Sequence, residues 1–589
     1  MKTRLKELLD GYEYTSDLDG AVSSKKSFLC RNVSGAMTVR TKKMISARAV
    51  RWARALSDIL SYTHSRVYGA LLLAFGIFTM LLHFAGDYFI NSVNISTAHL
   101  VAGAVIAILG LPFLMLEGPV CIAMQNHFVT DYIFFEFFCL KRMPRDKGVR
   151  GMNMLFGIMI GVMLAVAAFF LSVRAVALGV LGLVFLYLSF IAPEFPLLAG
   201  VIVMPILPLA PYSSIILSVI IGVGFLSFLR KVIFGKRVLH IEQYDVIFVM
   251  IMLCIAVSGA FSGSFTSFLP SLYTVLATLV YFLVGNLIAN RRTADCMASS
   301  LIISSVVPSI YGIVEFFMLA SRVGFIRALS LGVDSSMASR EAFAILLVVS
   351  LAFTFAYATE KRKKAEKAIC AITILINAAA LVFSGSFIAP LALASGIAVL
   401  AIYKYRRVAF LIIALVIALP YILFVFYDAP VISKLVALLA GRGAQEHILL
   451  LRESAAMALD NIILGVGIGQ TNAANLFLGL SLSAGAAALV LFLILMLVRM
   501  RHISVYTRYM KKSEVGNLAK ASFVAMVSLI AFGLTDFLFS DLSVYFIFIS
   551  VFAVGSATLR ISKRNYDDRH FYYKDSRAND SADIDVDLR

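Results

Sequence analysis

The apolar run MLFGIMIGVMLAVAAFFLSV (residues 154–173) is followed by a single Arg174 and by a second apolar run, AVALGVLGLVFLYLSFIA (residues 175–192). Each run is long enough to cross a hydrocarbon core of about 30 Å as an α-helix. The two runs therefore predict a membrane hairpin. Its tip carries Arg174, whose long side chain can extend to the membrane interface.

Runs of this kind recur along the whole chain of 589 residues. The chain is 61% hydrophobic with a mean hydropathy of +0.91, which leaves too little polar surface for a soluble globular domain. We predict an all-α polytopic membrane protein with about 14–16 transmembrane helices. The predicted spans are 68–86, 98–116, 153–173, 175–192, 197–211, 212–229, 243–261, 267–289, 297–320, 341–359, 368–386, 387–403, 408–427, 474–498, 519–539 and 542–558. Prolines at 205, 208 and 211 leave two interpretations of residues 197–229, a pair of spans or one re-entrant hairpin.

Lysine and arginine are distributed very unevenly between the two sides of these spans. One side holds only seven of the 52 basic residues: Arg174, Arg322, Arg327, Arg340, Lys434, Arg442 and Arg452. Because cytoplasmic loops retain positive charge, the other side is the cytoplasm, and both termini lie there. The net charge of +18 is then a topology signal and an attraction to anionic lipids, and nucleic-acid binding is disfavoured.

Three regions follow from this topology. Residues 1–66 form a basic cytoplasmic region, residues 67–559 the transmembrane bundle, and residues 560–589 a cytoplasmic tail that is rich in the acidic residue Asp and in Ser and that we expect to be disordered. In the first region, apolar residues around Trp52 repeat at helical spacing opposite a basic face. That pattern predicts an amphipathic helix, which either lies in the plane of the inner leaflet or packs on the bundle.

Two predicted outer segments are long enough to build a site. The first is residues 321–340, and the second, residues 428–473, is one large outer loop. Functional residues concentrate in such loops. The sequence has no Cys/His cluster with metal-ligand spacing, so we expect neither a metal nor another cofactor.

The large outer loop contains the most informative order of elements. Arg452 begins an amphipathic helical pattern that ends near Asp460, and the segment Gly465-Val-Gly-Ile-Gly469 follows it. Glycines at this spacing let backbone amides approach either an anion or a neighbouring helix. Asn475 then leads into a span that contains Ala484-Gly485.

This order resembles the carboxy-terminal signature of the O-antigen ligase and polymerase superfamily: an arginine, a helix, Gly-Val-Gly-x-Gly, His-Asn-x-x-Leu and Glu-x-Gly. Upstream, Pro308-Ser-Ile-Tyr-Gly and Leu381-Val-Phe-Ser-Gly-Ser resemble two further parts of that family, so the resemblance covers residues 240–560. It implies a metal-independent glycosyltransferase of the bacterial inner or plasma membrane. Such enzymes transfer a glycan from an undecaprenyl-diphosphate carrier to an acceptor glycan or glycolipid on the outer face.

The resemblance also implies roles for individual residues. Arg452 would bind and stabilise the diphosphate as it leaves, with Arg340 as the second arginine of the clamp. Arg442, Arg327 and Asn475 would add substrate contacts. The alternative for Arg442 and Arg452 is that both simply face lipid headgroups.

Three charged positions of the family pattern are uncharged in this chain. Its histidine falls on Ala474, its glutamate on Ser483 and its arginine on Phe387. His447, in the large outer loop, is the candidate replacement for the catalytic base, because histidine titrates near neutral pH. The alternative is a solvated loop histidine.

The sequence thus predicts an O-antigen ligase/polymerase-like protein of surface-polysaccharide assembly, and two alternatives stay open. A flippase or transporter for lipid-linked oligosaccharides would distribute charged residues along a central cavity. A non-catalytic family member would account for the three lost charges. A metal-dependent membrane glycosyltransferase is disfavoured, because the first outer loop offers only Asp87 as an acid.

The topology can be tested with an Ala365→Cys variant and a membrane-impermeant thiol reagent. We expect no labelling at this position in intact cells and labelling after the membrane is opened, because the segment from Lys361 to Lys367 is predicted to be cytoplasmic. Labelling of the introduced thiol in intact cells would contradict the predicted orientation.

Overall fold

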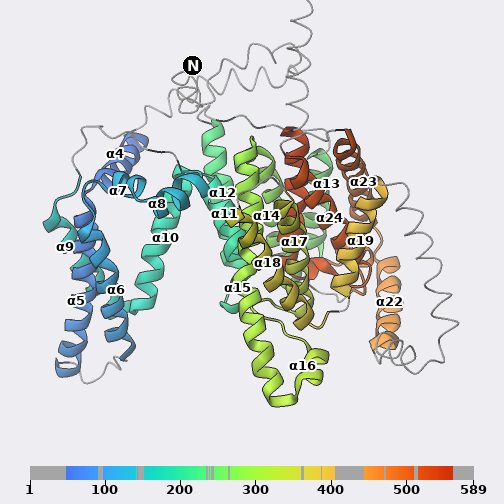
Figure 1. Ribbon diagram of the computed structural model, residues 1–589, viewed down its shortest axis with the longest axis horizontal. Coiled ribbons are helices and arrows are strands. Elements are labelled where there is room, and N and C mark those ends of the chain that lie inside the picture. Colours follow the sequence, from blue (N-terminus) through green and yellow to red (C-terminus); the bar gives the residue numbers. More distant parts are fainter. Residues whose placement is uncertain are drawn as a thin grey trace, which may run out of the picture. The chain divides into compact units, whose positions relative to one another are not determined.

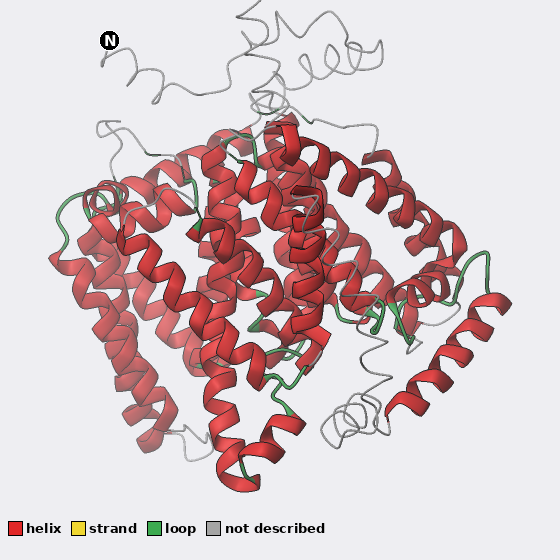
Figure 2. Ribbon diagram, turned by 45° about the vertical axis from the view of Figure 1, so that its right-hand side comes forward, coloured by secondary structure: helices red, strands yellow, loops and turns green. Residues whose placement is uncertain are grey.

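A computed structural model describes residues 48–89, 97–140, 142, 151–233, 237, 239, 245–262, 265–359, 364–386, 388–404, 443–469, 473–509 and 515–561. Nearly all of this part is helical, and it contains no strand (Figure 2). Eleven of its helices are long and apolar enough to cross a membrane, and four shorter apolar helices accompany them. The predicted class, an all-α polytopic membrane protein, is confirmed. The predicted span 408–427 lies outside the described residues.

The chain divides into two compact units. Unit 1 comprises Met1–Pro196 and Leu226–Leu239, and unit 2 comprises Leu197–Phe225 and His240–Arg589. The helices of unit 1 are α4 (Arg48–Tyr62), α5 (Ser65–Phe89), α6 (Thr97–Met115), α7 (Val120–Asn126), α8 (Phe128–Thr130), the π-helix η3 (Asp131–Phe137), α9 (Met154–Leu171) and α10 (Val173–Ile191) (Figure 1). Helices α11 (Glu194–Val203) and α12 (Ser213–Ile233) have residues in both units.

Unit 2 contains the remaining helices. They are η4 (Leu207–Leu209), α13 (Asp245–Phe261), α14 (Phe265–Leu287), α15 (Arg291–Val323), α16 (Phe325–Leu331), α17 (Arg340–Ala358), α18 (Lys364–Phe383), α19 (Ile388–Lys404), α22 (Gly443–Asp460), α23 (Leu476–Tyr509), α24 (Gly516–Gly533), η5 (Leu538–Ser540) and a terminal helix, Leu542–Ile561. The terminal helix and α17 are the most deeply buried of the apolar helices, so they form the core of the unit.

Small residues hold unit 1 together. A Cβ atom on Gly76 of α5 would lie 2.5 Å from the carbonyl oxygen of Gly103 in α6, and one on Gly161 of α9 would overlap the carbonyl oxygen of Leu71 in α5. Helices in membranes associate by such close backbone approach, because lipid tails are as apolar as leucine and hydrophobic burial gives little net gain. Helix α5 therefore packs tightly against both α6 and α9.

Helix α4 confirms the predicted helix in the basic region for residues 48–62. Its last two turns pack on the bundle, because the hydroxyl of Tyr187 in α10 donates to the Ser57 carbonyl oxygen (3.1 Å) and lies 2.6 Å from Ser61 Oγ. For this part of the helix, the contacts favour packing on the bundle over a position in the plane of the inner leaflet. The side chain of Trp52 lies outside the described residues.

The predicted span 197–211 is only half formed. Helix α11 is 10 residues long, about 15 Å at 1.5 Å per residue, and too short to cross a bilayer. Irregular backbone and the short η4 follow it as far as Tyr212, and α12 is then a full-length apolar helix of 21 residues. Pro205 lies in the irregular part, and its carbonyl oxygen accepts a hydrogen bond from Ser336 Oγ (2.7 Å).

An amide–hydroxyl network joins three helices inside unit 2. Asn377 Nδ2 of α18 donates to Ser305 Oγ of α15 (3.0 Å) and to Ser350 Oγ of α17 (2.9 Å), while Ser309 Oγ donates to Asn377 Oδ1 (2.7 Å). All four side chains are fully buried. Such hydrogen bonds between helices fix which faces of α15, α17 and α18 meet.

The close approach of α9 to α5 predicts a specific effect of a single methyl group. We expect Gly161→Ala to lower the free energy of unfolding by about 1–3 kcal/mol, because the new Cβ would press on the backbone of α5. Gly179→Ala in α10 is the matched control, since no atom lies within 4 Å of the Cβ position there. Thermal unfolding of both variants in detergent would show the difference. Equal stability would contradict the packing of α9 on α5.

Candidate functional site

The first predicted outer segment forms a small structure at one end of unit 2. Helix α15 continues to Val323, turns at Gly324 with φ of +88°, and is followed by α16 (Figure 1). A loop then leads from Gly332 to Ser339, whose side chain accepts a hydrogen bond from the Ala342 amide (3.1 Å) and so caps α17. We call residues 324–339 the α16 loop.

Three arginines of this region are exposed: Arg322, Arg327 and Arg340. Arg340 Nε lies 2.6 Å from Glu341 Oε1. Among the described residues, Arg322 and Arg327 form no ion pair or side-chain hydrogen bond. The end of unit 2 that carries the α16 loop is therefore a place where guanidinium groups meet solvent or lipid headgroups.

The α16 loop is fixed from beneath by polar contacts. The Ser335 amide donates to Glu315 Oε2 (3.0 Å), and the Ser335 hydroxyl donates to the Pro308 carbonyl oxygen (2.5 Å). Ser335 has φ of +56°, an unfavourable value for a residue with a side chain. Backbone strain of this kind persists only where the surroundings impose it.

The α16 loop also crosses the Ser384-Gly385 turn that follows α18. A Cβ atom on Gly385 would lie 2.9 Å from Gly332 Cα, and one on Gly332 would overlap the carbonyl oxygen of Ser384. The α16 loop thus contacts one of the segments that carry the family resemblance, because Ser384 and Gly385 belong to the Leu381-Val-Phe-Ser-Gly-Ser stretch. Phe387, which replaces the family's arginine, lies outside the described residues.

The Gly465-Val-Gly-Ile-Gly469 segment binds a break in a membrane helix. Helix α23 has non-helical backbone at Gly485, with φ of +85°. There the Val466 amide donates to the Leu482 carbonyl oxygen (2.8 Å), the Gly467 amide to that of Ser483 (3.2 Å), and the Ala486 amide to that of Ile462 (2.8 Å). These bonds satisfy backbone groups that the break would otherwise leave unpaired.

The glycines of this segment are needed for conformation and close packing. All three have positive φ: Gly465, Gly467 and Gly469. The Ile468 amide donates to Ser271 Oγ of α14 (3.3 Å). The sequence left two interpretations, approach to an anion or to a neighbouring helix, and the structure shows the second. The backbone amides of residues 466, 467 and 468 are already hydrogen-bonded within the protein.

Asn475 and the positions of the lost family charges also have structural roles. Asn475 Oδ1 accepts a hydrogen bond from the Leu478 amide (2.8 Å) and caps the first turn of α23. Ala474 is fully buried, and its amide lies 3.4 Å from Ser454 Oγ of α22. Ser483 is buried at the helix break, where its carbonyl oxygen also accepts from Ser258 Oγ (2.6 Å).

Helix α22 carries the other predicted catalytic residues. It lies at the periphery of unit 2, at the same end as α16 but not beside it, in both views (Figures 1 and 2). Arg452 is exposed and forms no ion pair or side-chain hydrogen bond among the described residues. His447 lies on this helix, but its side chain, like the whole of Arg442, lies outside the described residues. The shared site of Arg452 and Arg340 remains a prediction.

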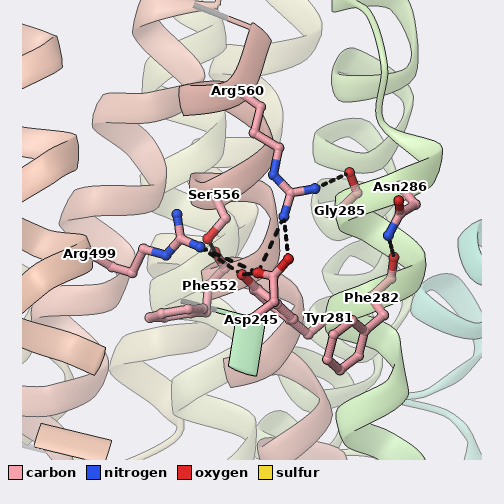
Figure 3. Close-up of polar contacts among 9 residues, drawn as sticks. All are labelled: Asp245, Tyr281, Phe282, Gly285, Asn286, Arg499, Phe552, Ser556 and Arg560. Atoms are coloured by element: carbon pink, nitrogen blue, oxygen red, sulfur yellow. Dashed lines mark hydrogen bonds and ion pairs between the residues drawn. The ribbon is translucent and has the colours of Figure 1, made fainter. Parts of the chain in front are cut away.

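A buried cluster of charged residues lies at the opposite end of unit 2 (Figure 3). Asp245, the first residue of α13, lies between two arginines: Arg499 Nη2 is 3.5 Å from Asp245 Oδ1, and Arg560 Nη2 is 3.3 Å from Oδ2. Tyr281 of α14 donates to Asp245 Oδ1 (2.5 Å) and accepts from Arg499 Nη2 (2.9 Å). Arg560 also donates to the Gly285 carbonyl oxygen (2.9 Å).

This cluster joins α13, α14, α23 and the terminal helix. Asp245 is 1% exposed and Arg499 3%, so their charges are sheltered from water. The sequence predicts that Arg499 and Arg560 lie in cytoplasmic segments, but it does not show that they meet. The sequence did hold one sign of this cluster, because Asp245, Arg499 and Arg560 carry opposite charges and lie at span ends on the same side of the predicted bundle. Which span ends meet is decided only by helix packing.

No model of a known protein family matches this chain, and a search of curated proteins found no match. Among the described residues, no group of three or more His, Cys, Asp or Glu side chains is arranged to hold a metal ion. A function for this chain is therefore proposed from the resemblance in the order of elements and from the geometry at the end of unit 2 that carries the α16 loop.

The charged cluster predicts a large effect of a nearly isosteric substitution. We expect Asp245→Asn to lower the free energy of unfolding by about 3–5 kcal/mol, because it removes the carboxylate that the buried guanidinium of Arg499 and the partly buried one of Arg560 contact. Glu117→Gln is the control, since its pair with Arg66 is exposed and such pairs contribute about 0–1 kcal/mol. Unfolding in detergent would measure both. A change for Asp245→Asn as small as the control would show that the cluster is not stabilising.

Proposed function

We propose that this protein binds an undecaprenyl-diphosphate-linked glycan at the outer end of unit 2 and transfers the glycan to an acceptor sugar. It would act in surface-polysaccharide assembly in a bacterial inner or plasma membrane, in the manner of the O-antigen ligase and polymerase proteins that it resembles. The observation that carries the proposal is the group of exposed arginines on and beside the α16 loop, at the end of a bundle of apolar helices.

A diphosphate is the ligand that such arginines suit best. The guanidinium group presents a planar set of donors that matches two phosphate oxygens at once, and it keeps its charge at every physiological pH. Arg327 and Arg340 lie at the two ends of the same short segment, so both can contribute to one anion-binding surface. Positive charge at this place also stabilises the diphosphate as the glycan leaves it.

The surface beside these arginines suits the lipid part of the carrier. Helix α15 exposes large apolar side chains near its outer end, and α16 exposes two more: Tyr311, Val314, Phe317, Met318, Phe325 and Ile326. A polyprenyl chain can lie along these side chains within the bilayer while its diphosphate remains at the interface. The surface therefore offers apolar side chains to the polyprenyl chain and arginines to the diphosphate.

One observation favours a second candidate function, a non-catalytic member of the same family. Asn475 caps a helix, and buried Ala474 and Ser483 stand where the family has its charged residues. Such a protein would bind the lipid carrier without transferring the glycan. Binding and transfer are therefore tested separately.

The binding step can be tested with purified protein in lipid nanodiscs and undecaprenyl diphosphate as the probe. We expect Arg327→Lys and Arg340→Lys each to weaken binding by about tenfold, which is about 1.4 kcal/mol, because an ammonium group cannot reproduce the two-pronged contact. Arg174→Lys is the matched control, since Arg174 is an exposed arginine of unit 1.

Wild-type affinity in both variants would remove the arginine clamp from the proposal. Transport is tested with the same preparation in vesicles. If the protein moved the lipid-linked glycan between leaflets and did not transfer it, the flippase alternative would replace the proposed function. Binding without transfer or movement would support the non-catalytic member.

A further inference from the structure

A single carboxylate interrupts the apolar surface near the outer end of α15. Glu315 lies on the helix between the exposed apolar residues Val314 and Phe317, and its side chain is half-buried. Taking a carboxylate out of water is costly unless it is paired or functional, and such groups inside membrane segments default to functional candidates. Its only hydrogen bond among the described residues is the one that Oε2 accepts from the Ser335 amide (3.0 Å).

The packing of α15 on α17 places Glu315 and Arg340 toward the same end of one helix–helix contact. A Cβ atom on Gly312 of α15 would lie 2.9 Å from Phe343 Cζ of α17, so the two helices touch at this point. Glu315 is three residues beyond Gly312 toward the outer end, and Arg340 is three residues before Phe343 toward the same end. Three residues correspond to about 4.5 Å of helix, and residues three apart share a helix face.

This register brings a base and a diphosphate-binding group into one layer. Both lie on the outer side of the same helix–helix contact, and the α16 loop passes above them because the Ser335 amide is hydrogen-bonded to Glu315. The strained backbone of Ser335 is held in place by that bond and by its hydroxyl bond to the Pro308 carbonyl oxygen. The loop thus fixes the Glu315 carboxylate while leaving Oε1 without a hydrogen bond among the described residues.

We propose that Glu315 is the catalytic base of the transfer reaction and that its ligand is the hydroxyl group of the acceptor sugar. This inference rests on the proposed function. The acceptor oxygen forms a bond to the anomeric carbon of the glycan while the bond from that carbon to the diphosphate oxygen breaks. The proton of the hydroxyl moves to the Glu315 carboxylate. The electron pair of the broken bond leaves with the lipid diphosphate, which Arg340 and Arg327 stabilise.

Other carboxylates at this end of unit 2 are less suited to the role. Glu341 is already paired with Arg340. Asp334 is exposed on the loop. Asp541 precedes the terminal helix and accepts the Ser543 amide with Oδ1 (2.8 Å), and no hydrogen bond or ion pair among the described residues joins it to the α16 loop. Glu315 also replaces the sequence-based candidate His447, which lies on α22 rather than beside the α16 loop.

The test uses cells that lack the chromosomal copy and carry plasmid-encoded variants of the full chain, so that the cells supply their own donor and acceptor. Surface polysaccharide on gels reports transfer, and lipid-linked glycan in membrane extracts reports unused donor. We expect Glu315→Gln to abolish transfer and to accumulate donor, while the purified variant keeps wild-type stability and wild-type affinity for undecaprenyl diphosphate. Asp334→Asn, the matched control on the same loop, should transfer normally.

Comparing the transfer activity of two Glu315 variants separates a catalytic role from a role in holding the α16 loop. Glutamine keeps the length and the acceptor for the Ser335 amide but lacks the base, whereas aspartate keeps the base and shortens the reach. A catalytic Glu315 predicts more transfer by Glu315→Asp than by Glu315→Gln, and a merely structural one predicts the reverse.

The remaining outcomes distinguish a failure of this inference from a failure of the proposed function. Full transfer by Glu315→Gln overturns the inference and leaves the proposed function intact, with His447→Ala as the next variant. If cells without the protein make normal surface polysaccharide and accumulate no donor, the proposed function fails and the inference fails with it.

Discussion

Backbone amides and carbonyls have no water to bind inside a bilayer, and the rest of this structure depends on how the chain satisfies them. Nearly all described segments do so as helices. The exception that matters most is the break in α23 at Gly485, where the Gly465–Gly469 segment supplies the missing partners through the bonds of Val466 and Gly467. A motif that can bind an anion elsewhere is used in this chain to complete a membrane helix.

Charged side chains are buried and paired at one end of unit 2 and exposed at the other. At one end, Asp245 holds Arg499 and Arg560 in a buried cluster that fixes four helices. At the other, Arg327 and Arg340 stay exposed beside a loop held by internal hydrogen bonds. Buried ion pairs make a rigid scaffold when both partners are present, and exposed guanidinium groups on such a scaffold are available to a ligand. This division supports an outer-face site for an anionic lipid.

The resemblance to ligases and polymerases of O-antigen is strongest in the order of elements and weakest in the charged residues. The structure gives a physical reason for some of the replacements. Ala474 and Ser483 are buried, and Asn475 caps a helix. The segment that holds charged motif residues in the O-antigen ligase and polymerase superfamily therefore stabilises α23 in this chain. If transfer takes place, its chemistry has to come from another part of the molecule, and the proposed source is Arg327, Arg340 and Glu315, which lie on and beside the α16 loop.

The sequence by itself determined the class of fold and most of the spans, because hydrophobic length and helical structure are tied together wherever no water is present. It also predicted which segments face outward and named Arg327, Arg340 and Arg452 as candidates. It did not show that residues 197–211 form only half a helix, because the bond from Ser336 to Pro205 comes from a distant part of the chain. Nor did it join Asp245 to Arg560, or Glu315 to the backbone of Ser335. Those relations depend on which helix faces meet, and only the packing of glycines and small side chains in the folded bundle decides that.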